Sequence, residues 1–163
     1  MATSGADYAG ESSEASAPGR ARLPSELLDL LDQPSLCFLA TAMPDGSPQL
    51  TQVWVGTDGE HILINTVGNS QKVRNVARDP RVAVNICVRD EPRRYWAVRG
   101  RVVAMTADGA SGHIDTLSQK YLGCPYPGFA GGREDRVLLI IVADTVTRPI
   151  DRRPAAAQAD TPG

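Results

Sequence analysis

The feature that most constrains the fold is a series of short apolar runs separated by strong turn signals. Asp45-Gly46 and Asp58-Gly59 are turns of the hairpin type, and each lies between two runs with the length and composition of β-strands. Six or so strands are expected, over residues 35–42, 48–55, 61–66, 82–88, 95–105 and 136–147. Short turns join antiparallel neighbours, whereas a parallel pair needs a long crossover. The sequence therefore predicts a mainly β fold, a small and mostly antiparallel β-barrel with inserted helices.

Helices are expected at three places around these strands. The first begins at residues 24–26, where a proline precedes an apolar, leucine-rich stretch. The second has about two turns and ends before Asp79-Pro80, because a residue preceding proline disfavours the helical conformation. The third begins with Asp108 or Ser111 as its N-cap and stops at Gly123.

The composition indicates one soluble domain. Of the 163 residues 42% are hydrophobic, which is enough to bury a core, and we expect a domain at 21–150 between disordered tails at 1–20 and 151–163. The net charge of −2 argues against a general nucleic-acid binder, and no apolar run is long enough to cross a membrane. The N-terminus lacks the pattern of a secretory signal. Three cysteines without a CxxC pair argue against a disulfide framework or a zinc site and fit a reducing cytoplasm.

The most informative polar stretch is residues 65–81, which lies between two apolar strands. It places Asn65-Thr66 at the end of a strand, then a glycine turn, and then Ser70 before a helix that carries Lys72 and Arg74. Hydroxyl groups, free backbone N–H groups and cations converge in such an arrangement, and together they bind phosphate. The stretch therefore predicts an anion site.

The usual catalytic motifs are missing from the sequence. It contains no GxSxG, HExxH or GxxxxGK[ST] motif. His61 and His113 lie far apart in unlike contexts, so no metal site is predicted. Cys37 and Cys87 lie in apolar strands and are expected in the core, whereas Cys124 lies in a loop. A phosphate site without proton-transfer groups points to chemistry performed by a bound cofactor.

Several motifs, taken in order, carry a family resemblance. They are Gln71-Lys72-Val73-Arg74-Asn75, Arg78-Asp79-Pro80-Arg81, Val98-Arg99-Gly100-Arg101-Val102, Lys120-Tyr121-Leu122-Gly123 and Tyr126-Pro127-Gly128. Over about residues 24–150 the chain resembles the split-barrel flavin and deazaflavin family of pyridoxamine 5'-phosphate oxidase. Within it, the chain is most similar to the actinobacterial branch of F-420-dependent oxidoreductases. The resemblance implies the FMN-binding split barrel.

The resemblance also implies a homodimer whose cofactor lies in a groove between the two barrels. Lys72 matches the family's phosphate-binding lysine, and Tyr95 and Trp96 match a segment that the partner subunit brings to the cofactor. The implied cofactor-binding residues are Gln49, Thr51, Gln52, Asn65, Thr66, Ser70, Gln71, Lys72, Arg74, Tyr95 and Trp96.

The function implied by the resemblance is an F-420-dependent reductase that transfers hydride to a small unsaturated or heteroaromatic substrate. Tyr95 and Tyr126 are the candidate proton donors. A hydrophobic pocket is expected at Val53, Trp54 and Val67, and the substrate loop at residues 123–134. Arg78, Arg81 or Arg133 are expected to meet an oligoglutamate tail of the cofactor, and the alternative for Arg78 to Arg81 is that they shape the turn. Two alternatives stay open, an FMN-dependent oxidase or flavin reductase on the same fold and a non-catalytic carrier of a cofactor or ligand.

Overall fold

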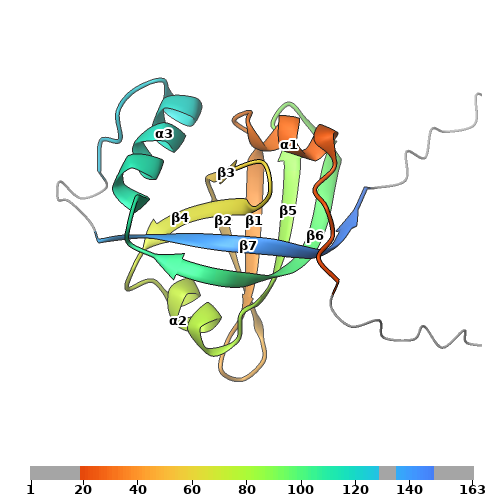
Figure 1. Ribbon diagram of the computed structural model, residues 1–163, viewed down its shortest axis with the longest axis vertical. Helices are drawn as coiled ribbons and strands as arrows, with labels where there is room; N and C mark the ends of the chain where they lie inside the picture. Colours follow the sequence, from red (N-terminus) through yellow and green to blue (C-terminus); the bar gives the residue numbers. More distant parts are fainter. Residues whose placement is uncertain (1–18, 129–134, 149–163) are drawn as a thin grey trace, which may run out of the picture.

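The computed structural model describes residues 19–128 and 135–148, and in this part the chain forms seven strands and three helices (Figure 1). In chain order these elements are α1 (Ser25–Leu31), β1 (Leu36–Ala42), β2 (Pro48–Val53), β3 (Val55–Thr57), β4 (Ile62–Val67), α2 (Gln71–Arg78), β5 (Arg81–Val88), β6 (Glu91–Thr106), α3 (Ala110–Leu122) and β7 (Arg136–Thr147). Every strand pairing is antiparallel, and the strand order is β2-β1-β5-β6-β7-β4-β3.

The sheet is forced to curl by the connection between its two edges. β2 and β3 are the edge strands, yet in the sequence only Trp54 separates them. Because neighbouring Cα atoms are about 3.8 Å apart, the two edges must meet at this residue. The curled sheet in Figure 1 follows from this closure. The structure confirms the mainly β barrel fold with inserted helices.

The prediction of one strand over residues 48–55 is wrong at its end. β2 stops at Val53, and Val55 pairs instead with Ile64 of β4 at the opposite edge. The reason is the closure itself, because the chain leaves one edge and joins the other at Trp54. The predicted start of the long strand at Tyr95 is also late, since β6 begins at Glu91 directly after the turn Arg89-Asp90.

The inward-facing side chains of the sheet form a continuous apolar core. Leu39, Val84 and Val98 are register neighbours on β1, β5 and β6, and all three are buried. One end of the barrel is covered by α1, whose buried leucines belong to the same core (Figure 1). Burying one side chain of this size stabilises a fold by about 1.5–3 kcal/mol relative to exposing it.

The helices agree with the predictions except at the start of α3. The second helix ends at Arg78 as predicted, with Pro80 following. The third stops at Gly123, whose φ of 73° favours glycine. Its N-cap, however, is Gly109, also at a φ of 73°, and neither Asp108 nor Ser111. No helix in the described part of the chain is long and apolar enough to cross a membrane.

The predicted tails lie outside the described residues except for Gly19 and Arg20. The Arg20 guanidinium bonds Glu60 at 2.6 Å and the Nε2 atom of His61 at 2.9 Å. The cysteines match their prediction, because Cys37 and Cys87 are buried and Cys124 is exposed. Burial raises the pKa of the Cys37 thiol to about 12, so this thiol stays protonated at neutral pH.

Asn75 fixes α2 against the barrel. Its side chain is fully buried, and its Nδ2 atom donates to Thr41 Oγ1 at 3.0 Å and to Gln49 Oε1 at 3.1 Å. Its Oδ1 atom accepts a hydrogen bond of 2.9 Å from Gln71 Nε2. The side chain of Asn75 thus connects α2 to β1 and β2, and it fixes the orientation of the helix on the barrel.

Replacement of Asn75 by alanine should lower the free energy of unfolding by about 1–3 kcal/mol, because buried partners on β1 and β2 lose their hydrogen bonds. Urea denaturation followed by circular dichroism measures this change. Gln119→Ala, at an exposed site on α3, is the control and should change the stability by less than about 0.5 kcal/mol. Equal stabilities of the two variants would show that Asn75 does not anchor the helix.

Candidate functional site

A cavity of about 520 Å³ opens where the sheet closes on itself. Its walls come from the start of β1, the end of β2, the end of β4, the first turn of α2, α3 and the start of β7. Trp54, which joins the two sheet edges, lies in this wall together with Val53 and Val67. The closure of the barrel therefore creates the cavity.

One side of the cavity is built from hydroxyl groups and cations. The Nζ atom of Lys72 donates to Thr66 Oγ1 at 3.2 Å, and Ser70 Oγ lies 3.5 Å from the same oxygen. Arg136, at the start of β7, lines the cavity beside them. Burial and the nearby charge of Arg136 lower the pKa of Lys72. We call Thr66, Ser70, Lys72 and Arg136 the cationic cradle.

The charge of the cavity has one sign. Its charged lining residues in the described part of the chain are Lys72, Arg89 and Arg136, and no aspartate or glutamate lines it. Because Arg136 destabilises the ammonium of Lys72, an anion placed between them would relieve the repulsion and gain two charge-assisted hydrogen bonds. The cavity is therefore suited to a negatively charged ligand.

The start of α2 adds backbone donors to the cationic cradle. Ser70 occupies the N-cap position with an extended backbone, but its side chain makes no capping hydrogen bond. The N–H groups of the first turn are thus not satisfied by the cap, and the positive end of the helix dipole lies beside Lys72. Together these groups match the donor set that binds phosphate at helix starts.

The other side of the cavity is aromatic. The rings of Trp54 and Tyr121 are stacked with centroids 5.2 Å apart and 5° between their planes, and Tyr126 meets Trp54 edge-on at 6.4 Å. The hydroxyl of Tyr121 donates to Ser35 O at 2.8 Å and accepts from Val55 N at 3.3 Å. These bonds fix Tyr121 in place, so the stacked pair is a rigid, flat wall.

Lys120 supports this wall from outside the cavity. Its ammonium donates to Leu31 O at 2.7 Å and also to Val55 O, and it lies 4.9 Å from the ring centroid of Tyr121. Burial lowers the pKa of Lys120 to about 8. Lys72 and Lys120 are the two lysines of the chain. Lys72 faces the cavity, whereas Lys120 connects α3 to α1 and β3.

Among the buried polar atoms of the cavity-lining residues are two, in Asn65 and Ser35, with no hydrogen-bond partner among the described residues. One is Asn65 Oδ1, whose amide orientation is fixed because Nδ2 donates to Ala110 O at 2.7 Å. The other is Ser35 Oγ. Unpaired buried polar groups are costly, so both are suited to bonding a ligand.

The cavity brings together only part of the predicted site. Gln52, Asn65, Thr66, Lys72 and Tyr126 line it, as do the residues of the expected hydrophobic pocket, Val53, Trp54 and Val67. The predicted site residues that do not line it are Gln49, Thr51, Ser70, Gln71, Arg74, Tyr95 and Trp96. Ser70 nevertheless lies at its edge, 3.5 Å from Thr66.

Most residues outside the cavity have other partners. Gln49 accepts hydrogen bonds from Asn75 and Thr41, and Arg74 donates to Gln71 Oε1 at 2.6 Å. Trp96 is half-buried, packs against the core and lies 5.5 Å from the guanidinium of Arg148.

The arginines expected to meet a cofactor tail also have partners. Arg78 donates to Ala42 O, and Arg81 pairs with Asp79 through two hydrogen bonds of 2.9 and 2.6 Å. Arg133, like residues 129–134 of the substrate loop, lies outside the described residues.

Six cavity residues were not predicted from the sequence as site residues, namely Ser35, Leu36, Arg89, Ile114, Tyr121 and Arg136. Arg136 carried a usable signal, because it is a cation at the head of an otherwise apolar strand. Tyr121 fitted the apolar spacing of a helix and gave no sign of lining a cavity. In the described part of the chain, no three His, Cys, Asp or Glu side chains are grouped so as to hold a metal ion.

Comparison with known proteins identifies the family. The family model described as pyridoxamine 5'-phosphate oxidase matches residues 23–148. The chain belongs to this family. Membership in it indicates an oxidoreductase of the flavin or deazaflavin type, and the curled antiparallel sheet is its split barrel. No curated protein matches the chain in sequence.

Solved structures give the same fold. A protein named F420 reductase has 30% sequence identity and a TM-score of 0.66, over 77% of this chain and 98% of that one. A conserved hypothetical protein from Mycobacterium tuberculosis has 26% identity and a TM-score of 0.61, over 79% of this chain and 85% of that one. HupZ from Group A Streptococcus shares the fold, with 16% identity and a TM-score of 0.56 over 77% of this chain and 93% of that one.

The different environments of the two lysines predict two separate titrations. Lys120 should lose its proton at about pH 8, and Lys72 should lose its proton below the ordinary value of 10.5, because burial disfavours both ammonium ions. NMR of protein labelled with ¹⁵N-lysine follows both side chains, and Lys72→Arg assigns them. Titration of both groups at the ordinary value would contradict the burial described above.

Proposed function

We propose that this protein is an F-420-dependent reductase, with the cofactor's phosphate in the cationic cradle. The observation that carries the proposal is the convergence of Lys72, Thr66, Ser70 and Arg136 at the start of α2, beside an aromatic cavity. The likeness to a protein named F420 reductase, at 30% identity, favours F-420 over FMN. When bound, the deazaflavin ring supplies the hydride.

The role of the chain in this proposal is to position the cofactor and substrate. Lys72 and Arg136 neutralise the phosphate, and Thr66 and the free N–H groups of α2 orient it. Asn65 Oδ1 accepts a hydrogen bond from a hydroxyl or N–H group of the cofactor. Trp54 covers one face of the cavity and excludes water from the reacting atoms.

Reduction of an unsaturated carbon needs a proton as well as the hydride. The hydride adds to one carbon of the double bond, and the adjacent carbon takes the proton. Tyr126 is the proposed donor, because it lines the cavity and Arg136 donates a hydrogen bond to its phenol oxygen. That bond stabilises the phenolate left after transfer. Tyr95 lies on β6, outside the cavity of its own subunit, so it could act only from a partner subunit.

Removal of the Lys72 charge should weaken F-420 binding by about tenfold or more, because a charge-assisted contact is lost in a half-buried site. Titration of Lys72→Ala with F-420, followed by cofactor fluorescence, measures the effect. Lys72→Arg should retain most of the affinity. Arg22→Gln, which removes an exposed cation outside the cavity, is the control and should bind like the wild type.

Unchanged affinity in Lys72→Ala would refute the proposed phosphate position. FMN also carries a phosphate and would fit the same cradle, so an FMN enzyme is the alternative. Tightly bound FMN would give a yellow purified protein that needs no added cofactor. F-420 binding without hydride transfer to any quinone or enone would instead indicate a carrier.

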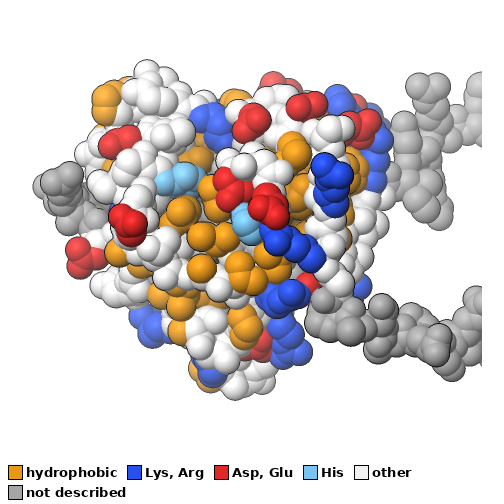
Figure 2. Space-filling model, in the orientation of Figure 1, with side chains coloured by type: hydrophobic (Ala, Val, Ile, Leu, Met, Phe, Trp, Pro, Cys, Tyr) orange, Lys and Arg blue, Asp and Glu red, His pale blue; other side chains and the backbone are white. Residues whose placement is uncertain are grey.

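We further propose that two copies pack through the outer face of the sheet. This face carries Leu50 on β2, a large hydrophobic side chain that is 67% exposed. Figure 2 shows further hydrophobic side chains over β4, β7 and β6, on a different part of the sheet. Exposed apolar patches of this kind mark interaction surfaces.

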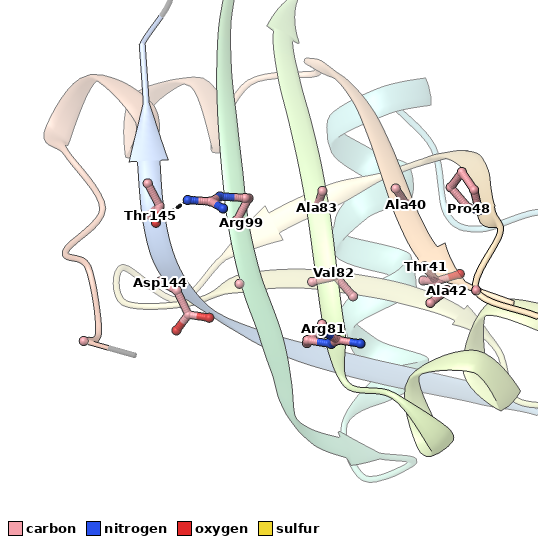
Figure 3. Close-up of a pocket in the computed structure, with 13 residues that line it drawn as sticks. Ala40, Thr41, Ala42, Pro48, Arg81, Val82, Ala83, Arg99, Asp144 and Thr145 are labelled. Carbon is pink, nitrogen blue, oxygen red and sulfur yellow. Dashed lines mark hydrogen bonds between the residues drawn. The ribbon is translucent and has the colours of Figure 1, made fainter. Parts of the chain in front are cut away.

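Small residues make the outer face of β2, β1, β5 and β6 accessible to a second copy. Leu50, Ala40, Ala83 and Arg99 are successive register neighbours from β2 to β6, and all point outward. Ala40, Ala83 and Arg99 line a groove of about 660 Å³, shown in Figure 3, and six of its thirteen lining residues are alanine or glycine. Side chains of another protein can enter such a groove closely.

Ala83→Arg should convert a dimer into a monomer, because a charged side chain would fill the groove floor. Light scattering after size exclusion should give twice the chain mass of 17.4 kDa for the wild type and a single chain mass for the variant. Ala77→Arg, on the exposed side of α2, is the control and should remain dimeric. A monomeric wild type would contradict the proposal.

A further inference from the structure

The cavity has a second cationic end, separate from the cationic cradle. Asn75 anchors α2 beside Thr41, near the last residue of β1, whereas Arg89 bonds Pro34, which precedes the first residue of β1. A strand rises about 3.3 Å per residue, so the two attachment points lie at opposite ends of a seven-residue strand. Lys72 on α2 and Arg89 nevertheless line one cavity.

Arg89 is held so that its terminal nitrogens are available. Its Nε atom donates to Pro34 O at 3.2 Å, and no other hydrogen bond or ion pair of its guanidinium is found among the described residues. A guanidinium anchored through Nε presents its two terminal nitrogens as a fork, and such a fork matches a carboxylate.

Ser35 supplies a second donor beside this arginine. Its side chain is only 2% exposed and lines the same cavity, yet Oγ has no partner among the described residues. Its backbone carbonyl accepts the hydroxyl of Tyr121, which fixes the residue next to the aromatic wall. A hydroxyl and a guanidinium thus lie at the edge of a flat surface.

The aromatic wall restricts the shape of the ligand. Trp54 and Tyr121 are stacked face to face, and on an outer ring face of the stack a flat conjugated molecule packs better than a branched one. No acidic side chain among the described residues lines the cavity, so nothing repels an anion there.

We propose that Arg89 and Ser35 form a carboxylate subsite, and that the reduced substrate is a planar, unsaturated carboxylic acid lying on the Trp54–Tyr121 wall. This inference rests on the proposed reductase function, and it adds the chemical class of the substrate. A carboxylate could also come from the oligoglutamate tail of the cofactor, and the experiment separates these two sources.

The test uses full-length protein without cofactor, so that it does not depend on F-420 binding. Calorimetric titrations compare 2-naphthoate with its neutral analogue 2-naphthamide. The wild type should bind the acid at least about tenfold more tightly than the amide. Arg89→Gln should lose this preference, whereas the Arg22→Gln control and Lys72→Ala should keep it.

Three results would overturn the proposal. Equal affinities of the wild type for acid and amide would show that no carboxylate subsite exists. Loss of the preference in Lys72→Ala but not in Arg89→Gln would place the carboxylate in the cationic cradle. The third result is an unchanged naphthoate preference in Arg89→Gln. If this variant also loses more affinity for long-tailed than for short-tailed F-420, relative to the wild type, Arg89 binds the cofactor tail. A failure of F-420 to bind would refute the reductase function and leave the naphthoate result standing.

Discussion

The connection through Trp54 is the constraint on which the rest of the structure depends. It joins β2 to β3, the two edges of one sheet, so the sheet has to close. Closure brings the end of β2 next to the end of β4 and opens the cavity between them. The residue that makes the closure also provides the aromatic wall, because its ring stacks on Tyr121 from α3. Architecture and site are therefore consequences of the same connection.

Buried polar side chains position the groups around this cavity. Asn75 attaches α2 to β1 and β2, and residues three apart lie on neighbouring parts of a helix surface, so its position helps to fix that of Lys72. Lys120 does the same for α3 through two backbone carbonyls. Burial of such groups is unfavourable unless they are hydrogen-bonded. Their retained bonds make the cavity rigid before any ligand arrives.

The sequence predicted the features that depend on neighbouring residues. Asp-Gly turns and apolar runs located most strands, and Ser70 with Asp79-Pro80 located α2. The break at Trp54 was missed because an aromatic residue favours a strand locally, and only the distant pairing of Val55 with Ile64 shows the closure. Arg89 and Tyr121 were missed for a similar reason, since they reach the cavity from elements remote in sequence.

The central claim is that the start of α2 and the end of β4 hold the phosphate of a cofactor. Binding of F-420 and of its phosphate-free chromophore to the wild-type protein, compared by fluorescence titration, tests this claim most directly. The phosphate contacts predict that removing the phosphate weakens binding by at least about tenfold. Equal affinities for the two compounds would contradict the claim, because the cationic cradle would then contribute nothing to cofactor binding.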